Sequence, residues 1–412
     1  MTMLLPQILG AQQVHPLSPV LKGWIEEREQ ALRTGYTKYQ AYYNGNHKAL
    51  LTDRLKKFLP NLEFRDNFCD VVVDAVAERL QVIGFESSDE KLGEWAWDVW
   101  QANRMDQTQL VAHTEAVMKG DAYVLVDWDE ENARPRLTFQ APDMIVPRYD
   151  PASRRISWAS KKWTWIPEIG DEPVTRLNLY FPDRVEKYRA IGGVWARHRD
   201  AGETIWPLPW LGRASEPLGV PLVHLRNRPM GDDFGMSELE GVLPMQDLLN
   251  KTLIDLMQIL DTQAWPQRWT VGVIPPSAGE YAIVPGSVWS MNADDPGVAR
   301  VGEFSAQGVE GVLKSIETIL QHIAGASRTP QHLFQIAGGF PSGEALKTAE
   351  AGLMHKVRAR QVGFGNAWED CMALALRVQN AFGPGHAFTE GAILETAWAD
   401  PESRNEREHL ES

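Results

Sequence analysis

The densest group of potentially reactive side chains in this 412-residue chain is a run of four carboxylates within residues 127–131. They are Asp127, Asp129, Glu130 and Glu131. Such a run could supply a general acid and a general base, or oxygen ligands for a divalent cation. It lies between two β-rich segments, 122–128 and 135–140, and neither histidine nor glycine occurs in it. This pattern favours a solvated hairpin turn, and a hydrolase that uses the cluster is the alternative.

Other residue types that support catalysis occur without the spacing that catalysis needs. The ten histidines never recur at a metal-ligand spacing such as H-x-x-x-H. The pair Gly338-Gly339 is not followed by the Lys-Ser/Thr of a phosphate loop, and Ser237 does not match a nucleophile elbow. Cys69 and Cys371 lie far apart on predicted helices, which indicates buried thiols in a reducing compartment. We therefore predict a protein that is not an enzyme and needs neither a metal nor another cofactor.

The charge balance limits the way in which this chain can meet nucleic acid. With 41 Lys and Arg against 55 Asp and Glu, the net charge is −14. Tight, nonspecific binding requires clustered cations that neutralise phosphates, so this balance argues against it. An acidic surface is compatible with DNA that slides past in short-lived contacts. No apolar run reaches the ~18–20 residues of a membrane span, and no signal peptide is evident, so we expect no membrane association.

The first 236 residues predict a mixed domain of helices and antiparallel strands. Helical spacing of apolar residues occurs at 17–59, 66–80 and 88–119. Alternating or β-branched runs follow the carboxylate hairpin. They lie at 144–148, 155–165, 174–181, 184–189, 193–197 and 220–225. Residues 201–236 are rich in proline and glycine and indicate an irregular connector.

The rest of the chain predicts rods joined by a β-rich segment and a loop. A helix is expected at 237–263, where Ser237 and Glu240 match a capping box, although Pro244 allows a kink or a later start. Short strands and turns follow at 264–307, and a second helix is expected at 308–328. A loop at 329–341 leads to a very long helix at 342–381. Beyond it, 382–412 predicts a short final segment or a disordered tail.

Two surfaces in this region are more apolar than a self-contained chain requires. The helix at 237–263 is apolar over more than half of its circumference, which predicts contact with a second subunit. Its candidate interface residues are Leu248, Leu249, Leu253, Leu256, Met257 and Leu260. The loop exposes apolar groups where a plain connection would be polar and shorter. A loop packed on its own protein is the simpler interpretation, and a tip that touches a partner or a passing polymer is the functional one.

Taken in order, several short motifs resemble the portal (head–tail connector) proteins of tailed bacteriophages, especially the siphophage type of actinobacterial phages. Each motif is weak by itself, but the ordered set is specific and covers most of residues 36–381. The motifs are YYNGNH at 42–47, NFCDVVVDAVAERL at 67–80, GF at 84–85, GDAYV at 120–124, VPLV at 220–223 with NR at 227–228, SELE at 237–240 and FPSGEALK at 340–347.

The resemblance implies an α+β, portal-like fold that forms a ring, usually of twelve subunits. It implies a wing at 1–236, stem helices at 237–263 and 308–328 around a clip at 264–307, a tunnel loop at 329–341 and a long wing helix at 342–381. With about thirty residues left, 382–412 would be a small crown or a tail. The tunnel loop would offer weak contacts to DNA. Its candidate residues are Gln331, His332, Leu333, Phe334, Gln335 and Phe340.

The resemblance also implies a location and a set of partners. The ring would occupy one vertex of the capsid in the virion, after assembly in the host cytoplasm. Double-stranded DNA would pass through its axis, and the terminase large subunit, a head–tail adaptor and the major capsid or scaffold protein would bind to it. Lys314 and Arg328 are candidates for transient contacts with phosphates. Another structural protein of the virion, assembled without a central channel, is a further alternative.

Overall fold

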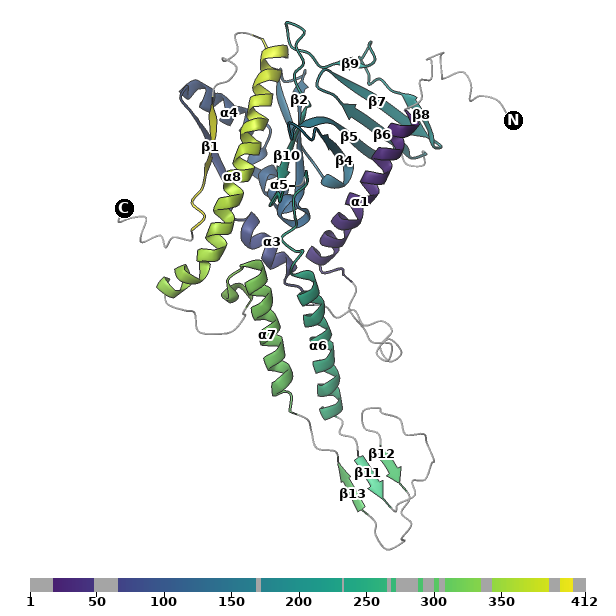
Figure 1. Ribbon diagram of the computed structural model, residues 1–412, viewed down its shortest axis with the longest axis vertical. Helices are drawn as coiled ribbons and strands as arrows, with labels where there is room; N and C mark the ends of the chain where they lie inside the picture. Colours follow the sequence, from purple (N-terminus) through teal and green to yellow (C-terminus); the bar gives the residue numbers. More distant parts are fainter. Residues whose placement is uncertain are drawn as a thin grey trace, which may run out of the picture. The chain divides into compact units, whose positions relative to one another are not determined.

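The chain folds into two compact units in the computed structural model (Figure 1). The structure describes residues 18–47, 66–167, 172–231, 233–264, 268–271, 288–291, 300–303, 308–334, 343–384 and 393–402. The first unit is discontinuous and contains 1–44, 70–240 and 350–412. The second unit contains 45–69 and 241–349.

The helices of the first unit begin and end where local chemistry allows it. They are α1 (Pro19–Tyr43), most of α3 (Cys69–Ala77), α4 (Glu90–Ala102), α5 (Met105–Lys119) and the greater part of α8 (Gly343–Phe382). Asp89 caps α4 by accepting a hydrogen bond from the amide of Lys91 at 3.1 Å. Gly120 ends α5 in the left-handed region at φ 98°. Helices were therefore correctly expected within 17–59, 66–80, 88–119 and 342–381, and residues 48–65 lie outside the described part.

Two antiparallel sheets form the β portion of the first unit. The three-stranded sheet has the order β10-β2-β3, and the larger sheet has the order β4-β5-β6-β7-β8 with β9 paired to β7. The strands of the smaller sheet are β2 (Asp121–Asp129), β3 (Arg134–Gln140) and β10 (Leu222–Arg226). Those of the larger sheet are β4 (Ile145–Tyr149), β5 (Ile156–Trp165), β6 (Val174–Tyr180), β7 (Arg184–Ile191), β8 (Val194–Arg197) and β9 (Leu208–Pro209). The strands expected from alternation are confirmed. Their sequence signal is local, because hairpin partners lie close together in the chain.

Helix α1 covers the six-stranded sheet through an apolar layer. Ile25 of α1 is buried against Leu177, Leu179 and Tyr188 of the sheet. At the edge of this layer the rings of Trp24 and Trp158 meet edge to face at 5.3 Å. The outer face of α1 carries charged residues, so the helix is amphipathic as its sequence predicts.

One strand pair in the first unit was not expected from the sequence. Strand β14 (Leu394–Trp398) pairs antiparallel with β1 (Val82–Ser87). Leu394 is buried, and the hydroxyl of Thr396 donates to the carbonyl of Gly365 on α8 at 3.2 Å. The alternative of a disordered tail at 382–412 is therefore wrong for 394–398, which are part of a sheet, and the small crown stays a prediction. Sequence periodicity missed both strands because each is short and its partner is about 300 residues away.

The core of the first unit contains a neutral histidine. The indole N–H of Trp368 donates to Nε2 of His113 at 3.0 Å, and a tryptophan can only donate. His113 therefore carries its proton on Nδ1 and donates it to the carbonyl of Leu80 at 2.9 Å. The ring also stacks on Phe364 at 5.4 Å. Complete burial lowers the pKa of His113 to about 4.

This histidine predicts a pH dependence of stability. Between pH ~6.5 and about 4, His113 is protonated in the unfolded chain but stays neutral in the folded protein. The free energy of unfolding therefore falls as the pH drops through this window. We expect a loss of up to about 3 kcal/mol from this group. Denaturant titrations at pH 7 and pH 5 would compare the wild type with His113→Gln, which cannot titrate. The variant should show a smaller loss, and equal losses would contradict the assignment.

The second unit contains two helices that pack side by side (Figure 1). They are α6 (Leu243–Ala264) and α7 (Glu310–Ser327), and the short helix η2 (Gln331–Phe334) follows α7. Between α6 and α7 in the chain lies a three-stranded sheet of order β12-β11-β13. Its strands are β11 (Arg268–Val271), β12 (Val288–Met291) and β13 (Arg300–Glu303). The expected helix–β–helix order of 237–328 is therefore present, and the remainder of 264–307 lies outside the described residues.

Helix α6 begins at Leu243 instead of at 237, so the predicted capping box is wrong. The hydroxyl of Ser237 accepts from the amide of Leu239 and donates to the carbonyl of Met118 in the first unit. Pro244 then falls in the first turn of α6, where its missing N–H costs no hydrogen bond.

Two buried amide side chains of α6 hold the segment at 66–68 within the second unit. Gln246 accepts from the amide of Phe68 at 3.0 Å and donates to the carbonyl of Asp66 at 2.8 Å. One turn later, Asn250 accepts from the amide of Asp66 at 2.8 Å and meets Nε2 of His47 at 2.9 Å. These bonds satisfy polar groups that burial would otherwise leave unpaired, which explains the two amides on an otherwise apolar face.

Candidate functional sites

The apolar face of α6 is only partly available to a partner. Leu248, Met257 and Leu260 expose 45%, 40% and 47% of their surface. Leu253 and Leu256 are half-buried. Leu249 is 1% exposed, so it is buried within its own chain and its prediction as a subunit-interface residue is wrong. Periodicity could not separate it from its neighbours, because all of these residues recur at helical spacing.

Helix α7 presents a polar stripe in which the two predicted phosphate contacts lie. The stripe consists of Gly311, Lys314, Thr318, Gln321, Gly325 and Arg328, all of them exposed. At 100° per residue these positions fall on one helix face. Lys314 and Arg328 are ~21 Å apart along the axis, so they cannot meet the same phosphate. The hydroxyl of Thr318 donates to the carbonyl of Lys314 at 2.9 Å, which leaves the stripe with few directed groups.

The start of the expected tunnel loop is a short helix with a buried end. Gln331 is exposed, whereas His332 and Leu333 are half-buried. Phe334 is 4% exposed and packs edge to face on Phe68 at 5.7 Å. Phe334 is therefore an anchor, and its prediction as a channel-facing residue is wrong. Gln335 and Phe340 lie outside the described residues.

Two of the carboxylates at 127–131 make their contacts within the β2–β3 hairpin that carries them. Asp127 pairs with Arg136 on the neighbouring strand at 2.6 Å. Asp129 accepts from the side chain of Asn132 at 2.8 Å and from the amide of Glu131 at 3.1 Å. These hydrogen bonds, that of the Asn132 side chain first, lower the pKa of Asp129, which makes it a poor general acid. Among the described residues, no group of three or more His, Cys, Asp or Glu is placed to hold a metal ion.

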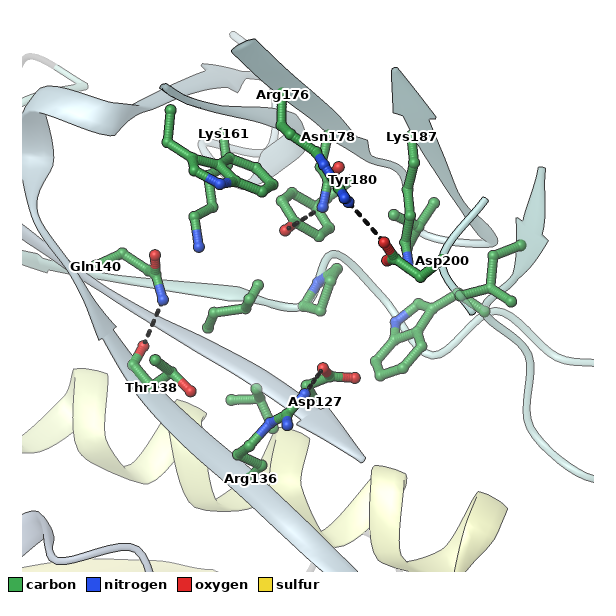
Figure 2. Close-up of a pocket in the computed structure, with 17 residues that line it drawn as sticks. Asp127, Arg136, Thr138, Gln140, Lys161, Arg176, Asn178, Tyr180, Lys187 and Asp200 are labelled. Atoms are coloured by element: carbon green, nitrogen blue, oxygen red, sulfur yellow. Dashed lines mark hydrogen bonds and ion pairs between the residues drawn. The ribbon is translucent and has the colours of Figure 1, made fainter. Parts of the chain in front are cut away.

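A cavity of about 470 Å³ is lined by residues of both sheets of the first unit (Figure 2). Most of its cations are paired: Arg176 and Lys187 meet Asp200 at 2.6 and 2.7 Å, and Arg136 meets Asp127. Lys161 makes no ion pair with the residues that the structure describes, and burial lowers its pKa. Each of these pairs joins residues of one sheet or the segment that follows it, so these side chains chiefly stabilise the sheet that carries them.

A buried carboxylate, Asp121, organises the start of β2. It accepts from the hydroxyl of Tyr36 at 2.7 Å, from the amide of Gly235 at 2.7 Å and from Nε2 of His224 at 2.8 Å. On its other side, Nδ1 of His224 accepts from the hydroxyl of Tyr149 at 2.6 Å. Burial lowers the pKa of His224, so the ring is neutral and its proton lies on Nε2. Asp121 thus links the small sheet directly to α1 and to the irregular connector at 201–236, and it links to the larger sheet through His224.

Two glycines make this meeting sterically feasible. Gly120 has φ 98°, and a Cβ there would lie 2.7 Å from the carbonyl oxygen of Gly235. A Cβ on Gly235 would in turn lie 2.0 Å from the carbonyl oxygen of Gly120. Any side chain at either position would force the two backbone segments apart. The motif at 120–124 thus has a physical explanation that the sequence did not provide.

A second buried carboxylate, Glu238, joins the connector to α8. Its side chain is 3% exposed and accepts from Arg360 and, at 3.3 Å, from Lys356. Asn227 donates to it at 3.2 Å, and Arg228 lies 3.8 Å away. Burial alone would raise its pKa, but the charges of Lys356 and Arg360 hold the pKa of Glu238 below its ordinary value. Sequence reasoning missed this cluster because it assigned the surrounding tetrad to a helix cap.

The first unit combines helices with antiparallel sheets, and the second contains a pair of helices with a small sheet between them in the chain. The family model for phage portal proteins, SPP1 Gp6-like, matches residues 22–411. The chain therefore belongs to the phage portal protein family. Among the described residues, no helix is long and apolar enough to cross a membrane.

Two curated proteins and two solved structures are similar to this chain. The chain is 26% identical to the portal protein of Mycobacterium phage L5 over 348 residues, which is 80% of this chain and 67% of the relative. It is 26% identical to the portal protein of Mycobacterium phage D29 over 351 residues, with the same coverage. Among solved structures, it resembles a chain in the neck of an empty GTA particle, with TM-score 0.44, 14% identity and 88% and 89% of the two chains covered. A chain in the virion of a native gene transfer agent matches with TM-score 0.42, 15% identity and 88% of each chain covered.

Proposed function

We propose that this portal protein assembles into a closed ring at one capsid vertex and conducts DNA during packaging and ejection. Twelve subunits is the number that the family resemblance implies. The ring would also be the docking platform for the terminase large subunit, the head–tail adaptor and the major capsid or scaffold protein. Its assembly would take place in the host cytoplasm before the virion is complete. Family membership over residues 22–411 is the observation that carries this proposal.

In this proposal α6 and α7 are the stem helices and 264–307 is the clip. The exposed side chains of Leu248, Met257 and Leu260 on α6, together with Leu313 on α7, support the stem assignment. Exposed apolar groups on a paired helix gain from burial against a neighbouring subunit, and head-to-tail repetition of one contact closes a ring. The first unit would be the wing, continued by α8.

We further propose that the polar stripe of α7 faces the channel. Its two cations are separated by ~21 Å, whereas B-DNA carries a charge every ~1.7 Å, so each subunit would neutralise few phosphates at a time. Three of the four charged residues of α6 are acidic, namely Asp247, Asp255 and Asp261, against one lysine. A sparse cationic stripe beside acidic helices allows short-lived contacts and would let DNA move.

The proposal is tested with a variant that lacks residues 335–339 of the tunnel loop and keeps the buried anchor Phe334. We expect the wild type and the deletion variant each to form particles of about 556 kDa by light scattering, twelve times the 46.3 kDa of one chain. Electron micrographs of both should show a central hole. The deletion should then strongly reduce DNA packaging or retention, because the channel loses its contact with DNA. Normal packaging by the variant would exclude the tunnel-loop role. A particle without a channel would favour another structural protein of the virion.

A further inference from the structure

A second cavity of the first unit, of about 560 Å³, is lined by four arginines from three different parts of the fold. Arg154 and Arg155 come from the turn between β4 and β5, Arg226 ends β10, and Arg377 lies on α8. We name these four residues the arginine cleft. Asp370 is the single acidic residue among those that line it. The cleft therefore carries a local excess of positive charge in a chain whose net charge is −14.

Two of the four arginines of the cleft have a polar partner in the described part of the chain. Arg154 pairs with Asp233 at 2.9 Å, and Arg377 donates to the carbonyl of Leu218 at 2.7 Å. Arg155 and Arg226 make no hydrogen bond or ion pair through their side chains with residues of the described ranges. Arg155 is exposed and Arg226 is half-buried, so water solvates both guanidinium groups and an anion can reach them.

The surroundings hold two of these side chains in place. Arg226 lies over the ring of Tyr149 at 5.6 Å, and Tyr149 is itself bonded to the buried His224. Arg377 lies where Gly219, at φ 93°, leaves room: a Cβ on this glycine would be 3.1 Å from the guanidinium. Stacked and backbone-bonded guanidinium groups are pre-organised, so less entropy is lost when they bind an anion.

We propose that the arginine cleft is a binding site for a phosphate group. Arg154 is already paired with Asp233, so the other three guanidinium groups against Asp370 leave two positive charges. A phosphate group with up to two charges, or two neighbouring phosphates of a DNA backbone, would neutralise them. The planar fork of arginine matches phosphate oxygens in pairs. The phosphate can come from the DNA backbone or from a free phosphate compound, and the experiment below separates these sources. This site is independent of the proposed channel.

The test measures binding of inorganic phosphate by calorimetry and of a 20-base-pair duplex by fluorescence anisotropy at constant ionic strength. The cleft variant is Arg155→Gln with Arg226→Gln. We expect it to weaken phosphate binding about tenfold or more, the loss associated with charged hydrogen bonds. Arg226→Lys keeps the charge without the fork and should give a smaller loss. The matched control is Lys91→Gln with Lys161→Gln, which removes two cations outside the cleft that form no ion pair with described residues. It should change binding less than about twofold.

Each outcome decides the proposal. If the duplex and inorganic phosphate both depend on the cleft, the site takes the DNA backbone. If only inorganic phosphate depends on it, the site takes a free phosphate compound. Absence of phosphate binding in the wild type, or an equal loss in the control, overturns the proposal. Binding of polyglutamate in place of phosphate would also overturn it and would assign the cleft to an acidic protein segment. Circular dichroism of each variant verifies folding.

Discussion

Replacing Glu238 by alanine is expected to lower the free energy of unfolding by about 3–5 kcal/mol. The side chains of Glu238, Lys356 and Arg360 expose only 3%, 5% and 12% of their surface. Without the carboxylate, two buried cations would lose the counter-charge that Glu238 supplies, and desolvation makes this loss costly. Denaturant titration followed by tryptophan fluorescence would measure the change.

The control for this prediction is Glu402→Ala, which removes a surface carboxylate paired with Arg358 at 2.6 Å. Both partners of this surface pair are about half exposed, so the loss should be below about 1 kcal/mol. If Glu238→Ala does not fold, the triple variant Glu238→Met, Lys356→Met and Arg360→Met should recover stability, because it removes the carboxylate together with both buried cations paired to it. Equal costs for the alanine variants at 238 and 402 would contradict the role of Glu238.

Replacing Asp121 by alanine is expected to cost several kcal/mol as well. Tyr36, His224 and the amide of Gly235 would each lose their acceptor inside the protein. An unsatisfied buried donor costs about 1–3 kcal/mol, and water that enters the gap would recover part of the sum. The same change should loosen the connector, because Gly235 is bonded to β2 through this carboxylate. Hydrogen exchange of the amide of Gly235 should therefore accelerate together with the loss of stability.

A surface aspartate of the same unit provides the comparison for Asp121. Asp183 pairs with Arg184 at 3.1 Å, and its side chain is 48% exposed. Asp183→Ala should change the free energy of unfolding by less than about 1 kcal/mol. Asp121→Asn should be milder than Asp121→Ala, because the amide oxygen can still accept hydrogen bonds from Gly235 and His224. If Asp121→Ala costs no more than Asp183→Ala, the carboxylate does not organise the fold.

The elements that sequence reasoning located correctly are those whose signals are local. The β2–β3 hairpin combines alternating residues with a short turn, and α4 begins at a capping aspartate, so their evidence lies within a few residues. Errors arose where a local pattern competes with a distant contact. The tetrad at 237–240 satisfies the capping-box pattern, yet the hydroxyl of Ser237 bonds to Met118, more than one hundred residues away. Leu249 and Leu260 likewise follow the same helical spacing, although one is buried and the other is exposed.

Residue types and their order along the chain sufficed to predict an α+β protein, most of its helices and strands, and its membership of the portal family. Only the folded chain revealed which charges neutralise one another. The partners of Asp121, Glu238 and the arginine cleft lie on segments from 36 to 377, and side chains separated by such distances in sequence carry no local signal of contact. Periodicity reports which face of an element is apolar. Burial and pairing of polar groups depend on which other segments reach that face, and tertiary packing alone decides this.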